Sequence, residues 1–186
     1  MSPSLSSPRI AIIGAGIIGL SCAWELAKRG AHVTLFDSGF YPGRGASWAA
    51  AGMLAPAYEA AAEPGVNPRL FDLCLKSARQ WIDMSGAIAA VTRRDVLHSI
   101  GPSLAVAQTA EDRIQLAGLA KALTARKIAF DVLSPDEAVQ AEPCLRVGNK
   151  GALRLPTDGQ VDNRLLVEAL IRALESQERV AFVTGT

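Results

Sequence analysis

Residues 9–19 read Arg-Ile-Ala-Ile-Ile-Gly-Ala-Gly-Ile-Ile-Gly, and this stretch decides how the chain folds. Its first part, residues 9–13, has the length and the β-branched content of a buried parallel strand. Apolar side chains at helical spacing follow over residues 17–29, and a second apolar run over residues 32–36 ends at Asp37. Because so short a crossover between parallel strands is almost always right-handed, the stretch predicts a right-handed βαβ unit.

The glycines of this stretch have the spacing Gly-x-Gly-x-x-Gly, which is typical of a dinucleotide-binding loop between a strand and a helix. Gly14 permits the tight turn out of the strand, Gly16 lets the backbone approach a pyrophosphate, and Gly19 lets the helix lie close to the sheet. The free amides at the start of the helix, around Ile17 and Ile18, then face the phosphates with the positive end of the helix dipole. We therefore expect the loop to bind the ADP half of a dinucleotide.

Asp37 comes at the end of the second strand, where an acidic side chain can accept hydrogen bonds from the hydroxyl groups of the adenosine ribose. A carboxylate at this position argues against the 2′-phosphate of NADP. The βαβ unit does not by itself distinguish FAD from NAD. A glycine-rich turn that binds no ligand is the structural alternative.

The composition favours a soluble globular protein and gives no support to nucleic-acid binding. Hydrophobic residues make up 49% of the 186 residues and charged residues 20%, which is enough apolar material for a core. The formal net charge is +1, from 19 basic and 18 acidic residues, without a run of five like charges. The longest apolar stretch, residues 10–23, is interrupted by glycines and is shorter than the roughly 18 residues that suggest a membrane span.

The remaining chemistry-bearing residues are few. The three cysteines are Cys22, Cys74 and Cys144. Their odd number and wide spacing predict buried, reduced thiols in a cytoplasmic protein. The two histidines, His32 and His98, have no spacing that would assemble a metal site with cysteines or carboxylates, so we expect no metal. Residues 1–8, rich in Ser and Pro and without Lys or Arg, predict a loose tail and not a secretory signal.

Beyond the βαβ unit the sequence predicts further helices and strands. Small residues over 46–54 open a helix between two loops, at 38–45 and 56–68. The longer helices are expected over residues 69–91, 109–126 and 163–176, with a short one after the capping box at Ser134. Strands are expected over residues 95–108 (two, turning at Gly101-Pro102), 128–133, 151–155 and 180–183. The apolar face of the helix over 69–91 is assigned to Leu70, Leu73, Cys74, Ser77, Ala78 and Trp81.

Two further segments carry a family resemblance. Residues 43–56 read Gly-Arg-Gly-Ala-Ser-Trp-Ala-Ala-Ala-Gly-Met-Leu-Ala-Pro, and residues 157–162 read Thr-Asp-Gly-Gln-Val-Asp. They resemble the Arg-x-x-Ser-x-Ala-Ala-Gly-Met-Leu and Asp-Gly-x-Val-Asp-Pro segments of the FAD-dependent D-amino-acid oxidase superfamily, and most closely its glycine oxidases of thiamine biosynthesis. The chain departs from the family in having Asn163 in place of the proline and Asp37 where glutamate is common.

The resemblance implies FAD as the cofactor. Small side chains over residues 46–53 let backbone amides approach the flavin and the pyrophosphate, Ser47 can donate to a phosphate, and Met53 can edge the substrate side of the flavin. The cofactor-binding residues expected on this basis and from the glycine loop are Gly14, Gly16, Ile17, Ile18, Gly19, Asp37, Ser38, Ala46, Ser47, Ala51, Gly52 and Met53.

The fold implied is α/β: a Rossmann-like FAD-binding βαβ domain, with part of a second, α+β substrate domain. Residues 1–60 and 150–186 are expected to form the FAD-binding domain, and residues 61–149 part of the substrate domain. The family's substrate-binding arginine and active-site tyrosine lie in a C-terminal half that would follow Thr186, so no catalytic residue is assigned.

Three functions remain open at this point. The first is the N-terminal portion of an oxidase that converts glycine, a small D-amino acid or a secondary amine to an imine, with hydrogen peroxide as the second product. Its partners are then a small amino-acid substrate and oxygen, with a homo-oligomer left open for the full-length protein. The second is an NAD-linked dehydrogenase, and the third is a non-catalytic fragment that binds a nucleotide or a partner.

Overall fold

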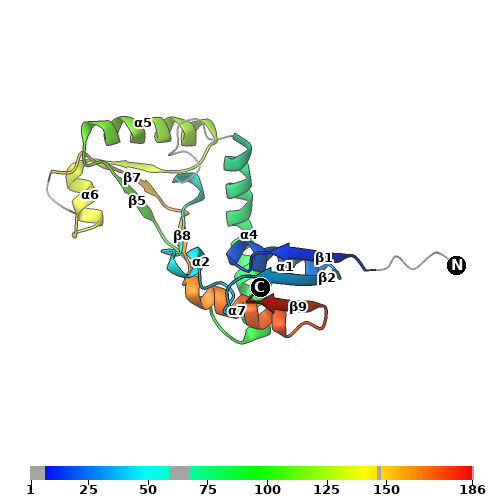
Figure 1. The fold of residues 1–186 in the computed structure, drawn as a ribbon. Helices are drawn as coiled ribbons and strands as arrows, with labels where there is room; N and C mark the ends of the chain where they lie inside the picture. Colours follow the sequence, from blue (N-terminus) through cyan, green and yellow to red (C-terminus); the bar gives the residue numbers. More distant parts are fainter. Residues whose placement is uncertain (1–6, 59–67, 146–147, 186) are drawn as a thin grey trace. The chain divides into compact units, whose positions relative to one another are not determined.

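The computed structural model describes residues 7–58, 68–145 and 148–185. The chain divides into two compact units, each built from segments that are separate in the sequence (Figure 1). The first unit comprises Met1–Gly52, Ile82–His98 and Val161–Thr186, and the second comprises Met53–Trp81 and Ser99–Gln160. Residues 1–6 of the tail expected over 1–8 and most of the loop expected over 56–68 lie outside the described residues.

The first unit contains the predicted βαβ arrangement as the core of a parallel sheet. The strands are β1 (Arg9–Ile13), β2 (His32–Asp37) and β9 (Val180–Thr184), in the order β1-β2-β9. β2 pairs with both other strands and so lies between them, and both pairings are parallel. The helix α1 (Ile17–Lys28) connects β1 to β2, and α7 (Asn163–Glu175) precedes β9. The sequence predictions for these strands and helices are confirmed to within one residue at each end.

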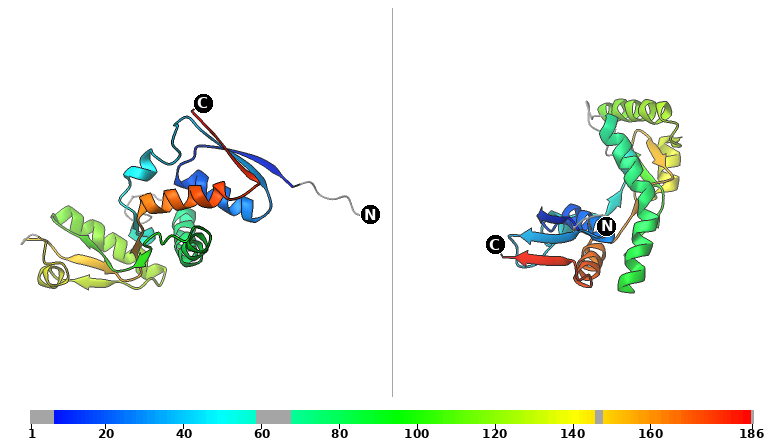
Figure 2. Two further views of the ribbon diagram at one scale, coloured as in Figure 1. Left: turned by 90° about the horizontal axis from the view of Figure 1, so that it is seen from below. Right: turned by 90° about the vertical axis from the view of Figure 1, so that its right-hand side faces the viewer.

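Two helices cover one face of this sheet (Figure 2). The predicted apolar side of α1 is confirmed, because its buried residues are Leu20, Ala23, Trp24 and Ala27. The buried residues of α7 are Leu166, Val167, Ala169, Leu170, Ala173 and Leu174. Asp162 is the N-cap of α7, and one of its carboxylate oxygens accepts the amides of Arg164 and Leu165 at 3.0 and 2.9 Å.

The second unit holds two small antiparallel sheets. One has the order β5-β7-β6, with β5 (Ser103–Val106), β7 (Ala152–Leu155) and β6 (Asp131–Leu133). The other has the order β3-β8-β4 and consists of two-residue strands. Those strands are β3 (Met53–Leu54), β8 (Gly159–Gln160) and β4 (Ser99–Ile100).

The helices of the second unit begin at recognisable signals. α5 (Ala110–Ala125) and α6 (Pro135–Ala141) each start with a capping box, formed by Thr109 with Asp112 and by Ser134 with Glu137. The long helix α4 (Pro68–Thr92) contributes its part up to Trp81 to this unit and the rest to the first unit.

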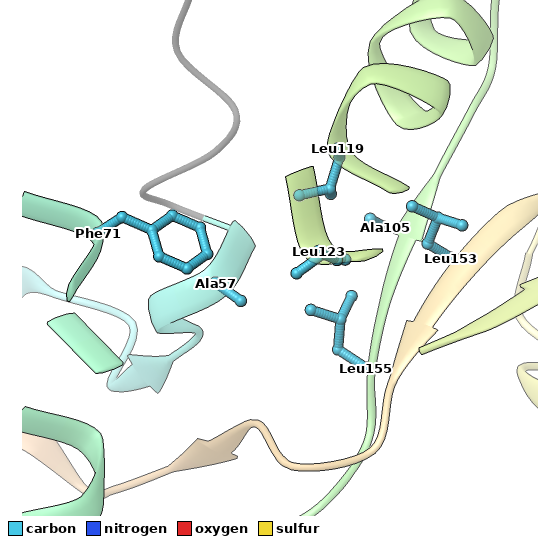
Figure 3. Close-up of a cluster of buried hydrophobic side chains, with 7 residues drawn as sticks. All are labelled: Ala57, Phe71, Ala105, Leu119, Leu123, Leu153 and Leu155. Carbon is cyan, nitrogen blue, oxygen red and sulfur yellow. The ribbon is translucent and has the colours of Figure 1, made fainter. Parts of the chain in front are cut away.

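Seven buried apolar residues form the core of the second unit (Figure 3). Leu119 and Leu123 of α5 face Leu153 and Leu155 of β7. The other members of this core are Ala57, Phe71 of α4 and Ala105 of β5. The core thus joins the antiparallel sheet to α4 and α5.

Several expectations from the sequence are wrong in detail. The helix expected over residues 46–54 is only α2 (Ala46–Ala49), and Met53 and Leu54 form a strand. Part of the loop expected over 56–68 is helical, at residues 56–58. The two strands expected over residues 95–108 exist, but they pair with β8 and β7 and not with each other.

The apolar face of α4 and the burial of the cysteines also differ from expectation. Leu70 and Leu73 are exposed, while the neighbouring Phe71 is buried in the core of the second unit. All three cysteines are free, but Cys22 and Cys144 are exposed.

No helix in the described parts of the chain combines the length and the apolar character that crossing a membrane requires.

Candidate nucleotide-binding site

The loop between β1 and α1 has the geometry that its glycines predict. Gly14 has a φ of +98°, a left-handed conformation that side chains disfavour, and its amide donates to the carbonyl oxygen of Phe36 at 2.7 Å. A Cβ at Gly19 would lie 1.9 Å from the carbonyl oxygen of Gly14. Gly14 is therefore required for the turn, and Gly19 for the close approach of α1 to the end of β1.

The start of α1 meets a hydroxyl group from a distant part of the chain. Gly16 is the N-cap of α1 and offers no side chain to it, and the Ile17 amide instead donates to Ser47 Oγ at 2.9 Å. A Cβ at Gly16 would lie 3.2 Å from the same oxygen, which is closer than most such contacts. The sequence led us to expect a free amide at Ile17. In the structure this amide instead donates a hydrogen bond to the hydroxyl of Ser47. A hydroxyl that accepts one hydrogen bond can still donate its own hydrogen. The Ser47 hydroxyl can therefore accept from the Ile17 amide and donate to an anion at the same time.

The carboxylate of Asp37 is held in place by two backbone amides. Its Oδ2 accepts from Ala15 at 2.7 Å, and its Oδ1 accepts from Gly39 at 2.8 Å. A carboxylate has about four acceptor positions, so the carboxylate group keeps acceptor capacity beyond these two bonds. The sequence pointed to Asp37 but not to Ala15, although Ala15 stands between the first two glycines of the motif.

The glycine loop, the start of α1 and Ser47 line one hollow of the first unit, with a volume of about 710 Å³, whereas Asp37 is not among its lining residues. The predicted site residues that line it are Gly14, Gly16, Ile17, Ile18, Gly19, Ala46 and Ser47. It is also lined by Cys22 and Ala50, which the sequence reasoning did not assign to the site. Cys22 follows Gly19 by three residues on α1, so helical spacing could have identified it, while Ala50 directly follows α2.

The other predicted site residues are placed differently. Ser38 is exposed and follows Asp37, while Ala51 is exposed just after α2. Gly52 has a φ of +76°, and a Cβ there would lie 2.0 Å from the carbonyl oxygen of Val161. Met53 lies in β3 of the second unit and is 59% exposed. Gly52 thus has a structural requirement of its own, which is the close packing of its backbone against Val161.

Charged and aromatic side chains hold the segment of residues 44–48, which includes Ser47 of α2, against α7. The Arg44 guanidinium lies 3.5 Å from the centre of the Trp48 ring, and that of Arg164 lies 5.4 Å from it. Glu168 of α7 pairs with Arg44 at 3.8 Å and with Arg94 at 3.5 Å. These pairs are partly exposed, so each contributes little alone, but together they join this segment to α7.

Among the residues that the structure describes, no group of three or more His, Cys, Asp or Glu side chains is placed to hold a metal ion. The site instead offers a helix N-terminus, backbone amides, a hydroxyl and a fixed carboxylate. Groups of these kinds are the ones with which dinucleotide-binding proteins contact phosphates and ribose.

Comparisons with solved structures place the fold among flavoenzymes. The chain matches the glycine oxidase from Geobacillus kaustophilus with 30% sequence identity and a TM-score of 0.86, over 96% of this chain and 47% of that one. It matches the iminodiacetate oxidase from Chelativorans sp. BNC1 with 26% identity and a TM-score of 0.73, over 94% of this chain and 46% of that one. The fold also matches that of the L-α-glycerophosphate oxidase from Mycoplasma pneumoniae, solved with FAD bound, with 22% identity and a TM-score of 0.78, over 96% of this chain and 44% of that one.

The chain thus spans less than half the length of each of these enzymes. A family model described as FAD dependent oxidoreductase, named DAO, matches residues 9–186, which is nearly the whole chain. The match begins with the first residue of β1 and includes the glycine loop, Asp37 and the segment of Ser47. The chain therefore belongs to the DAO family of FAD-dependent oxidoreductases.

Proposed function

We propose that the chain is the FAD-binding N-terminal portion of an oxidase that acts on the C–N bond of glycine, a small D-amino acid or a secondary amine. The observation that carries the nucleotide part of this proposal is the bond from the Ile17 amide to Ser47 Oγ beside Gly16. The likeness to a glycine oxidase at 30% identity supports the amine as the substrate class.

The residues of the first unit fit the ADP half of FAD. Gly16 leaves room that a Cβ would fill, at the positive end of α1, so the pyrophosphate would lie against this turn. The Ser47 hydroxyl would donate to a phosphate oxygen, and the remaining acceptor positions of Asp37 would take the ribose hydroxyls. The Ile18 amide and the exposed Ser38 would complete this group of contacts.

The flavin part of the cofactor would be bound by the segment around Ser47, over residues 46–53. Ala46, Ala51, Gly52 and Met53 have small or flexible side chains, which let their backbone approach a planar ring. We retain the domain assignment made from the sequence as part of this proposal, with residues 1–60 and 150–186 binding FAD and residues 61–149 belonging to the substrate domain.

When bound, FAD supplies the two-electron acceptor for oxidation of a C–N bond. In the overall reaction that we propose, the amine, oxygen and water give a 2-oxo acid, hydrogen peroxide and either ammonia, from a primary amine, or a primary amine, from a secondary one. The residues of this chain contribute binding and orientation of the cofactor. The described cysteines are free, which supports a reducing compartment such as the cytoplasm.

The test is to express the complete reading frame that contains this chain and to measure its visible spectrum and its peroxide production. We expect a yellow protein that releases peroxide with at least one of glycine, sarcosine, D-alanine and iminodiacetate. A colourless protein that produces no peroxide would contradict the proposal. An absorbance change that depends on a nicotinamide, without bound flavin, would instead support the NAD-linked alternative.

A further inference from the structure

The side chain of Asn163 reaches from the start of α7 to α2 at the nucleotide site. Its Nδ2 donates to the carbonyl oxygen of Ser47 at 2.7 Å and to that of Trp48 at 3.0 Å. Because both partners are acceptors, the amide group can face them only with its nitrogen. Related segments of the oxidase superfamily carry proline at this position, and proline has no side-chain donor. A proline at position 163 could therefore not make these two contacts.

The helix that receives these bonds is too short to be stable alone. α2 (Ala46–Ala49) has four residues, and the carbonyl groups at its end have no partner within the helix. Asn163 binds two of these carbonyl groups, and the Arg164 Nε adds a further bond to Trp48 at 3.3 Å. The first two residues of α7 thus cap α2 from another element.

We propose that Asn163 is a positioning residue of the nucleotide site, which acts through Ser47. Ser47 takes part in both contacts. Its backbone carbonyl oxygen accepts from Asn163, and its hydroxyl oxygen accepts from the Ile17 amide at 2.9 Å. Asn163 therefore sets the place of Ser47 Oγ at the N-terminus of α1 and raises the affinity for the dinucleotide. The inference rests on the proposed function, because it assigns the effect of Asn163 to binding of FAD.

A competing explanation gives Asn163 no such effect. The stacking of Arg44 and Arg164 on the Trp48 ring, at 3.5 and 5.4 Å, would hold α2 by itself. In that case Asn163 would only begin α7, and its replacement would change the stability of the protein without changing the site. The two explanations differ in what happens to the Ile17 amide.

The test uses Asn163→Pro, which removes the donor but keeps the start of α7. Proline suits the first position of a helix, and Asp162, with a ψ of 103°, already has the extended geometry that precedes a proline. We expect the Ile17 amide to exchange with solvent about tenfold faster and the Kd for FAD to rise about tenfold. In a Ser47→Ala background the same change should alter the Kd less than about twofold, because the two residues act as one unit.

Asp162→Ala is the matched control. It removes the N-cap of α7 but keeps the side chain of Asn163, so it should lower the melting temperature and leave the exchange of Ile17 unchanged. The inference would be overturned if both variants changed the exchange rate of the Ile17 amide equally, or if Asn163→Pro changed neither this rate nor the Kd for FAD. It would also be overturned if the effects of Asn163→Pro and Ser47→Ala on the Kd were additive. If the proline variant does not fold, Asn163→Ala replaces it. If the parent chain binds no FAD, the proposed function fails, and the exchange rate of Ile17 still decides whether Asn163 positions Ser47.

Discussion

Gly19 lies so close to Gly14 that a Cβ on Gly19 would stand 1.9 Å from the carbonyl oxygen of Gly14. The atom that such a Cβ would meet belongs to the backbone and cannot rotate away. The Gly14 backbone is also fixed by the bond from its amide to Phe36. The close approach of α1 to the end of β1 thus depends on a residue without a side chain at position 19.

Gly19→Ala should therefore destabilise the chain. Alanine gains up to about 1 kcal/mol over glycine inside a helix, but overpacking against rigid atoms costs roughly 1–3 kcal/mol, so the loss wins. The matched control is Gly118→Ala in α5, where a Cβ would meet nothing within 4 Å. The control should raise the free energy of unfolding by about 0.5–1 kcal/mol. Urea unfolding of both variants measures this, and a Gly19→Ala variant as stable as the parent chain would refute the packing argument.

Asp37→Ala should weaken both the fold and the binding of FAD. The carboxylate accepts the amides of Ala15 and Gly39, so its removal leaves the buried Ala15 without this partner even when no ligand is bound. We expect a loss of roughly 1–3 kcal/mol in the free energy of unfolding without FAD. Loss of the ribose acceptor should in addition weaken the binding of FAD by about 1.5–3 kcal/mol. Unfolding and calorimetric titration measure the two effects, and an unchanged FAD affinity would remove Asp37 from the proposed site.

Asp158 predicts a pH dependence of stability in the second unit. Burial raises the pKa of this carboxyl group above its ordinary value near 3.8, and the hydrogen bond from Ser103 opposes the rise in part. The folded chain then binds the proton more tightly than the unfolded chain. This contribution is present below pH 3.8 and is lost as the pH rises through the raised pKa. Relative to Asp158→Asn, the parent chain should become less stable between pH 3 and pH 7.

Ser103→Ala provides the control for this titration. Removing the hydroxyl removes the bond that lowers the pKa of Asp158, so the loss of stability should extend to a higher pH. Unfolding curves at several pH values would show it. A difference between the parent chain and Asp158→Asn that does not vary with pH would contradict the assignment.

Asp112 predicts a pH dependence of the opposite sign at the start of α5. Hydrogen bonds from the amides of Gln108 and Thr109, and then from the side chain of Thr109, lower the pKa of its carboxyl group from 3.8. Its contribution is therefore present above pH 3.8 and is lost as the pH falls through the lowered pKa. Asp112→Ala should be less stable than the parent chain at pH 7, and the difference should shrink as the pH falls through the lowered value. Thermal unfolding at pH 7 and in acid tests this, and a difference that grows in acid would disprove it.

The sequence predicted the elements whose signals are local. The glycine loop and the capping box at Ser134 depend on residues close in sequence, and the structure has both. The face of α4 was assigned wrongly in part, because Leu70 and Leu73 have helical spacing as good as that of Phe71, while Cys74 of the predicted face does pack against the core. Which of these side chains is buried depends on the distant core of Leu123 and Leu155, which periodicity does not describe.

Sequence patterns also could not predict which distant strands pair or which site residues contact each other. Residues 101–102 look like the turn of a hairpin, but the strands on either side pair with β8 and β7, which come far later in the chain. Likewise the hydroxyl of Ser47 and the side chain of Asn163 act on residues 30 and 116 positions away, respectively. The sequence therefore indicated candidate residues for the site, while only the structure shows that Ser47 Oγ accepts a hydrogen bond from the Ile17 amide.

Titration of the chain with FAD, and in parallel with NAD, tests the central claim most directly. Calorimetry should show one FAD per chain, with an affinity that falls when Ser47 is replaced by alanine, and much weaker binding of NAD. Absence of FAD binding to the folded chain, or an affinity that does not change on replacing Ser47, would contradict the account.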